Sequence, residues 1–214
     1  MAVYIADLRS TSGWSERWVA ADGSFTTTAD GFRITKTGET GSYAITWDTI
    51  DSDANRDVIE ILAKVRLVTQ AAATTMVGVV CRGAGASGAQ DLVRAYLYDA
   101  GNDGADRFII DEYASGSQSI YLASTSRSNV ANTWYWIKLR ADGTSCKARL
   151  WADGSAEPST WTLDATVSVN AVGWAGIYAF DTATDPYDLG YFAVATNGDT
   201  VSGSSGGFFL GADF

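Results

Sequence analysis

Hydrophobic and polar residues alternate with a period of two along most of the chain. The longest example is VIEILAKVRLV, residues 58–68, and shorter ones occupy residues 92–98 and 134–140. In the first of these, one face carries Ile59, Ile61, Ala63, Val65 and Leu67, and the other carries Glu60, Leu62, Lys64 and Arg66. This pattern is typical of β-strands with one buried face and one wetter face.

Short turn signals separate these alternating segments. Asp-Gly and Asn-Gly pairs suit hairpin turns because these residues tolerate positive φ; they include Asp22-Gly23, Asp142-Gly143, Asp153-Gly154 and Asn197-Gly198. The spacing predicts about a dozen strands and no helix longer than one or two turns. We therefore expect an all-β fold, a two-sheet antiparallel β-sandwich of the jelly-roll type, formed by residues 1–197 as one domain.

Composition excludes several classes of partner. The 214 residues are 46% hydrophobic and carry 25 acidic against 15 basic side chains, for a net charge of −10. Nucleic-acid binding needs a basic footprint, so we expect no nucleic-acid partner. No segment approaches the roughly 20 apolar residues of a membrane span. The N-terminus, MAVYIADLRS, lacks a basic start and a long apolar core, so we expect no signal peptide.

The chain contains no histidine, which excludes a Ser-His-Asp triad, a Cys-His pair and any zinc site that needs imidazole. Its two cysteines, Cys81 and Cys146, lie in apolar runs without metal-ligand spacing. This favours two buried free thiols over a disulfide, without excluding the disulfide.

The segment RLWADGSAEPSTW, residues 149–161, combines two tryptophans, Glu157 and Pro158. With the preceding TWYWIKLRADGTSCKA and the later GWAGIYAF (173–180) and DLGYFAV (188–194), it resembles the concanavalin A-like lectin and glucanase domains of the laminin G-like branch. In that resemblance the segment is a hairpin framework. We expect Trp161 to pack onto the sandwich and Glu157 to accept backbone hydrogen bonds, which we favour over a catalytic role for Glu157.

Enzymes of this resemblance use paired carboxylates on one strand, as in Glu-x-Asp-x-x-Glu. The nearest candidates here are Asp57 with Glu60 and Asp111 with Glu112. Both spacings put the two side chains on opposite faces of a strand. We therefore expect no enzyme activity, and a glycoside hydrolase remains the weakest of the alternatives.

Lectin-like sites stack aromatic rings on sugars and use planar polar groups for the hydroxyls. Side chains of this kind on the predicted wetter faces form a candidate carbohydrate site: Glu60, Arg66, Arg94, Tyr96, Tyr98 and Trp136. The alternative is that these residues form cross-strand pairs that only stabilise the sheet. The resemblance also implies one structural calcium ion, with Asp188 matching the metal-binding aspartate and Asp7 lying in the opening segment.

The C-terminus forms a separate segment, residues 198–214, in which the spacer GDTVSGSSGG precedes an apolar end. Its large apolar side chains, Phe208, Phe209, Leu210 and Phe214, predict either an arm that docks on a neighbouring subunit or a last edge strand. The absence of a signal peptide in a fold that normally works outside cells favours a bacteriophage virion component, such as a capsid decoration, tail or fibre-associated protein. Its partners would be other virion proteins, copies of itself or a cell-surface glycan. The alternative is a free-standing glycan-binding lectin.

Overall fold

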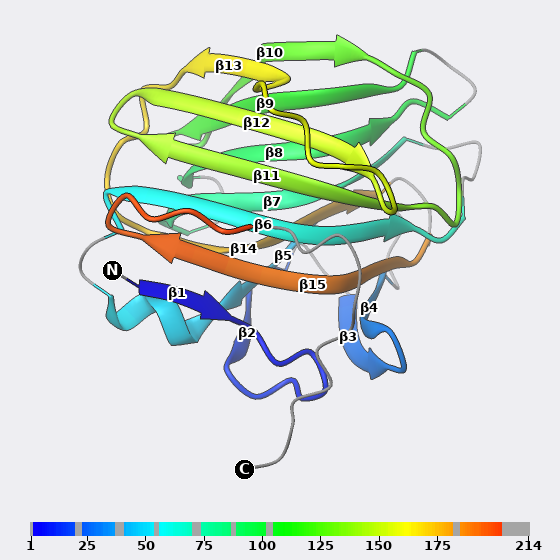
Figure 1. Ribbon diagram of the computed structural model, residues 1–214. Helices are drawn as coiled ribbons and strands as arrows, with labels where there is room; N and C mark the ends of the chain where they lie inside the picture. Colours follow the sequence, from blue (N-terminus) through cyan, green and yellow to red (C-terminus); the bar gives the residue numbers. More distant parts are fainter. Residues whose placement is uncertain are drawn as a thin grey trace.

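The chain forms two antiparallel β-sheets that pack face to face (Figure 1). The computed structural model describes residues 2–19, 23–36, 41–53, 56–69, 74–86, 89–101, 105–181 and 185–202. Within them lie fifteen strands and one 3₁₀ helix, η1 (Asp48–Ser52). This confirms the predicted all-β sandwich. The helix is far too short to span a membrane, and the described residues hold no other candidate.

The eight-stranded sheet has the order β13-β12-β11-β6-β15-β4-β3, with β1 also paired to β15. Its strands are β1 (Ala2–Ile5), β3 (Gly23–Thr28), β4 (Gly31–Lys36), β6 (Val58–Leu67), β11 (Trp134–Asp142), β12 (Ser145–Ala152), β13 (Leu163–Thr166) and β15 (Tyr187–Thr196). The hairpin between β11 and β12 turns just after Asp142, where the sequence predicted a turn.

The seven-stranded sheet has the order β10-β9-β8-β7-β14-β5-β2. Its strands are β2 (Trp14–Val19), β5 (Gly41–Trp47), β7 (Thr75–Ala84), β8 (Asp91–Asp99), β9 (Arg107–Ala114), β10 (Ser117–Ser126) and β14 (Trp174–Asp181). At the top of Figure 1, β10 and β13 are the outermost strands of the two sheets on the same side of the sandwich.

The main core lies between the sheets, and the alternating pattern predicted its residues correctly. On β6 it contains all five expected side chains, Ile59, Ile61, Ala63, Val65 and Leu67. On β8 and β11 it likewise contains the predicted inward set, Val93, Ala95, Leu97, Tyr135, Ile137 and Leu139. Period-two alternation therefore assigned each of these strands to the correct face.

The prediction that the opposite faces of these strands are wet is wrong at several positions. Glu60 is 2% exposed, and both Leu62 and Arg94 are also buried. On the eight-stranded sheet the reason is a third layer outside the two sheets: residues 197–202 fold back over the sheet after β15 (Figure 1), and the Val201 side chain packs in one cluster with Leu62. The first residues of the predicted spacer are thus packed, whereas Phe208, Phe209, Leu210 and Phe214 lie outside the described residues.

The segment 149–161 forms the predicted framework, with a different role for its glutamate. Glu157 Oε1 accepts a hydrogen bond from Arg149 Nη1 at 2.8 Å and pairs with Lys138 Nζ at 2.6 Å. Trp161 stacks on the Arg149 guanidinium at 4.1 Å. Glu157 therefore joins side chains of two strands, where backbone hydrogen bonds at the turn were expected.

Both cysteines are buried free thiols, as the apolar runs predicted. Burial raises the pKa of the Cys81 thiol to about 12. The thiolate, which is the reactive form, is therefore scarce at neutral pH in the folded chain.

Candidate glycan-binding face

The six predicted carbohydrate-binding residues lie on opposite sides of the molecule. Arg94, Tyr96 and Tyr98 come from β8 and point away from the core on the outer surface of the seven-stranded sheet, here called the seven-strand face. Glu60, Arg66 and Trp136 come from β6 and β11, on the outer surface of the other sheet, here called the eight-strand face. One glycan residue cannot contact both groups.

The centre of the seven-strand face is an ion pair between neighbouring strands. Arg94 on β8 lies directly opposite Asp111 on β9, and its Nε donates to Asp111 Oδ1 at 2.7 Å. The two side chains are 1% and 0% exposed. Asp111 Oδ2 also accepts hydrogen bonds from the Tyr96 hydroxyl and from Gln118 Nε2, each at 2.8 Å. The carboxylate thus binds three polar side chains from the two strands on either side of β9.

Three tyrosine rings surround the Arg94 guanidinium. Its Cζ lies 4.2 Å from the ring centroid of Tyr178, 4.8 Å from that of Tyr96 and 4.9 Å from that of Tyr113. Burial, with Asp111 as a further cause, raises the pKa of Tyr96, and burial also raises the pKa of Tyr113. Arg94 Nη1 is buried without a hydrogen-bond partner, so one donor of the cluster is unused.

Exposed groups border this cluster on the β10 side. The Tyr113 hydroxyl donates to Gln118 Oε1 at 3.0 Å, so the exposed Gln118 connects the surface to Asp111. Tyr121 is 47% exposed on the same strand, and the Arg107 guanidinium lies 5.5 Å from its ring centroid. The face therefore combines a rigid polar centre with aromatic and amide groups accessible to solvent.

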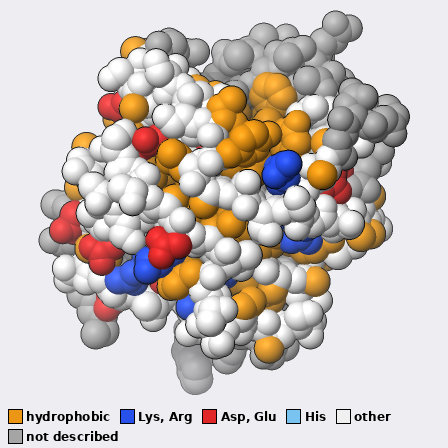
Figure 2. Space-filling view, turned by 90° about the horizontal axis from the view of Figure 1, so that it is seen from above, with side chains coloured by type: hydrophobic (Ala, Val, Ile, Leu, Met, Phe, Trp, Pro, Cys, Tyr) orange, Lys and Arg blue, Asp and Glu red, His pale blue; other side chains and the backbone are white. Residues whose placement is uncertain are grey.

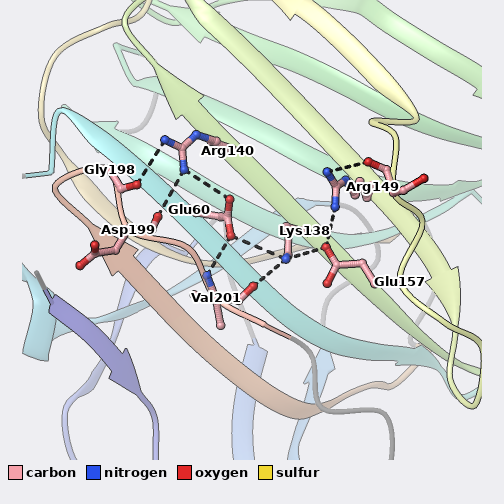
Figure 3. A network of polar contacts seen from close by, with 9 residues as sticks. Glu60, Lys138, Arg140, Arg149, Glu157, Gly198, Asp199 and Val201 are labelled. Atoms are coloured by element: carbon pink, nitrogen blue, oxygen red, sulfur yellow. Dashed lines mark hydrogen bonds and ion pairs between the residues drawn. The ribbon is translucent and has the colours of Figure 1, made fainter.

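The eight-strand face is covered by the chain itself, as Figure 3 shows around Glu60. Glu60 Oε1 accepts the backbone N–H of Val201 at 2.9 Å, and Lys138 Nζ donates to the Val201 carbonyl at 2.6 Å. Arg140 reaches the carbonyl of Asp199 at 3.2 Å. Glu60 thus holds residues 198–201 on the sheet and has no surface to offer a sugar.

The other two predicted residues of this face are also engaged within the chain. Arg66 stacks on Trp134 at 4.4 Å and donates through Nε to Asp188 at 3.1 Å. Trp136 is stacked on Trp151, with ring centroids 6.2 Å apart, and its Nε1 donates to Asp153 at 2.8 Å. Burial opposes ionisation of Asp153, but the hydrogen bonds from Lys64 and Trp136 outweigh it and lower its pKa.

The geometry does not fit the expected calcium site. Asp188 is buried, and its carboxylate is bound by two guanidinium groups, Arg33 at 2.8 Å through Nε and Arg66. These positive charges oppose a cation at Asp188. Asp7 is exposed and pairs instead with Arg9 at 2.9 Å. Across the described ranges, no three Asp, Glu, Cys or His side chains gather as a metal site would require.

Neither candidate carboxylate pair forms a catalytic site. Asp111 points to the seven-strand face, whereas Glu112 accepts hydrogen bonds from Ser168 and from the Val169 N–H at 3.0 Å. Glu60 is held in the network of Figure 3, and Asp57 is exposed. The prediction that these neighbours point apart is confirmed for Asp111 and Glu112.

Sequence analysis named Arg94, Tyr96 and Tyr98 of this site but missed most of the rest. The missing residues are Asp111, Tyr113, Gln118, Tyr121 and Tyr178. Asp111 was considered only as a catalytic acid, and its pairing with Arg94 depends on the β8–β9 register. The available signal was limited to Tyr96 and Tyr98 at alternate positions of one strand, because Tyr113, Tyr121 and Tyr178 are single tyrosines on three other strands.

Comparison with known proteins gives structural matches only. No protein-family model matches the chain, and no curated protein matches its sequence. The exoplasmic/lumenal domain of VIP36 in a Ca²⁺- and Man₃GlcNAc-bound form has a TM-score of 0.62 at 11% identity, covering 94% of this chain and 92% of that one. The carbohydrate-binding module CBM66 from Bacillus subtilis gives 0.58 at 15%, covering 83% and 91%.

A third match is the CBM2 module of the evolved Dit protein of Lactobacillus casei BL23 phage J-1. Its TM-score is 0.57 at 12% identity, covering 92% of this chain and 96% of that one. All three identities are low, so the matches establish the architecture and leave the ligand open. The chain has the jelly-roll β-sandwich fold of the concanavalin A-like lectins.

Proposed function

We propose that the chain is a non-catalytic glycan-binding module whose site is the seven-strand face. The observation that carries the proposal is the Arg94–Asp111 ion pair, which is buried on the outer side of a sheet and surrounded by tyrosines. A buried ion pair contributes little net stability, because desolvation offsets the attraction between the charges. The pair does, however, hold the exposed Gln118 amide beside the partly exposed Tyr113 ring at the surface, and an amide next to an aromatic ring is the chemistry that binds sugar hydroxyls and sugar faces.

Two of the matched structures are described by their carbohydrate ligands or binding class, which supports the same proposal. The proposed site consists of protein groups alone. Measuring binding with and without EDTA tests the calcium ion that the sequence resemblance implied.

The proposal predicts glycan binding that depends on Gln118 and Tyr113. On a glycan array followed by calorimetry, Gln118→Ala and Tyr113→Ala should each weaken binding by about tenfold or more, which corresponds to about 1.4 kcal/mol. Trp161→Ala is the matched control, because this aromatic residue stacks on Arg149 at the eight-strand face. Its affinity should equal that of the wild type.

Two results would contradict the proposal. One is that no glycan on the array binds, and the other is that Trp161→Ala abolishes binding while Gln118→Ala leaves it intact. Bound glycans should be recovered uncleaved, since no pair of carboxylates from the described residues flanks the site. Release of reducing ends would favour a glycoside hydrolase.

We further propose a bacteriophage virion as the setting of this module, with a cell-surface glycan as its ligand. The likeness to the phage J-1 Dit module supports this candidate. Genes for capsid and tail proteins beside this gene would agree with it. A secretion signal upstream of Met1, without such neighbours, would favour a free-standing lectin.

A further inference from the structure

Arg107 is a basic side chain at the border of the seven-strand face. It is the first residue of β9, where it lies opposite Tyr98 on β8 and Ser126 on β10. Phe108 and Ile110 point into the core, so alternation places Arg107 on the same outer face as Asp111. Its side chain is partly exposed to solvent.

Among the described residues, the carboxylates nearest to Arg107 in sequence, Asp106 and Asp111, are bound to other groups. Asp106 accepts the backbone N–H groups of Ala100 at 3.2 Å and Asn129 at 2.8 Å. Asp111 is bound by Arg94. Within the part of the chain that the structure describes, Arg107 has no ion pair, and its guanidinium lies against the ring of Tyr121.

A β-bulge presents Tyr121 to solvent. Ser119 pairs with Glu112 and Ala123 with Ile110, so Ile120, Tyr121 and Leu122 all lie opposite one residue of β9. Tyr121 has a φ of 58°, in the left-handed region that residues with large side chains rarely adopt. Bulges of this kind redirect side chains, and they are frequent beside functional sites.

The bulge gives this edge of the sandwich an apolar surface. Ile120 and Tyr121 are among the most exposed large hydrophobic side chains of the described chain. Figure 2, which views the molecule from the β10 and β13 side, shows hydrophobic side chains gathered in the middle of this edge with a basic side chain beside them. An exposed aromatic ring next to an unpaired guanidinium is complementary to a sugar ring that carries an anionic group.

We propose that Tyr121 and Arg107 form a subsite for an acidic sugar residue, in which the sugar ring stacks on Tyr121 and its carboxylate or sulfate pairs with Arg107. This inference rests on the proposed glycan-binding function and adds the ligand's charge to it. The net charge of the chain repels polyanions at long range, so the subsite recognises a single acidic residue at short range. Short oligosaccharides are therefore the appropriate probes.

The test uses calorimetry with three trisaccharides that share one backbone. The first carries one uronic acid residue, the second is its neutral form in which the carboxyl group is reduced, and the third is the neutral form with one sulfate group. The wild type should bind at least one acidic form about tenfold more tightly than the neutral form, since a charge-assisted hydrogen bond is stronger than a neutral one. Arg107→Gln should remove this difference while neutral binding persists. Tyr121→Ala should weaken binding of all forms. Preference for carboxylate or for sulfate identifies the anion.

Arg9→Gln is the control, because Arg9 is another exposed guanidinium outside this face. It should behave as the wild type, and a single cooperative melting transition should confirm that each variant folds. If Arg107→Gln keeps the wild-type preference, or if the neutral form binds as well as both acidic forms, the subsite is wrong while the glycan-binding proposal stands. If no trisaccharide and no array glycan binds, both proposals fail.

Discussion

At the scale of single residues, several charged side chains form ion pairs between neighbouring strands. Arg94 and Asp111 are both buried and bind each other through adjacent strands, whereas Lys147 and Asp164 form a similar pair in solvent. The burial of the two pairs differs, so their removal should have very different consequences. A buried charge left without its partner keeps its full desolvation cost.

Asp111→Asn should therefore destabilise the fold strongly, by about 3–5 kcal/mol in the free energy of unfolding. The exposed counterpart Asp164→Asn should cost less than about 1 kcal/mol, as surface pairs do. Urea unfolding followed by tryptophan fluorescence measures both values. Equal, small effects would show that the Arg94–Asp111 pair does not organise the seven-strand face.

The alternating pattern predicted correctly which way these side chains point, but it was wrong about how exposed they are to solvent. Alternation put Arg94, Tyr96 and Glu60 on the faces away from the core, as observed. It could not show that Glu60 lies under Val201. Val201 is 141 residues further along the chain, and a contact over that distance leaves no periodic signal in the sequence. Nor could it join Arg94 to Asp111, since that pairing depends on the register between strands.

At the scale of elements, the segment after β15 acts as a third layer on the eight-strand face. Val201 is 3% exposed and packs on the cluster that includes Leu62, Trp136 and Trp151. Its backbone binds Glu60 and Lys138 at the same time. The stability of the sandwich therefore depends on residues that composition alone suggested were a spacer.

Two truncations separate this layer from the apolar end. Removing residues 198–214 exposes Trp136 and deprives Glu60 and Lys138 of their backbone partners, and burial of a residue like Val201 alone contributes about 1.5–3 kcal/mol. We expect this chain to melt roughly 5–10 °C below the chain that lacks only residues 203–214. Differential scanning calorimetry measures the difference, and equal melting temperatures would contradict the layer.

For the apolar end, residues 206–214, both predictions stay open: an arm that docks on a neighbouring subunit, or a last edge strand. If residues 206–214 dock on a neighbouring subunit, the chain without residues 203–214 should lose assembly and remain folded. Sedimentation of the full-length chain beside the chain without residues 203–214 measures whether assembly is lost.

At the scale of the whole molecule, the two outer faces are built differently. The eight-strand face is closed by residues 153–161 and 197–202, which engage Arg149, Lys138 and Glu60. The seven-strand face holds a polar centre that is bordered by exposed Gln118 and Tyr121. The sandwich itself was predictable from period-two alternation and turn residues. The structural difference between its two outer faces was not, because it arises from contacts between strands and loops distant in sequence.

The crystal structure of the chain with the tightest glycan from the array tests the central claim most directly. We predict electron density for the sugar on the seven-strand face, within hydrogen-bonding distance of Gln118 and in contact with the ring of Tyr113 or Tyr121. Density for the sugar on the eight-strand face, or at the ends of the sandwich away from β8, β9 and β10, would contradict the account.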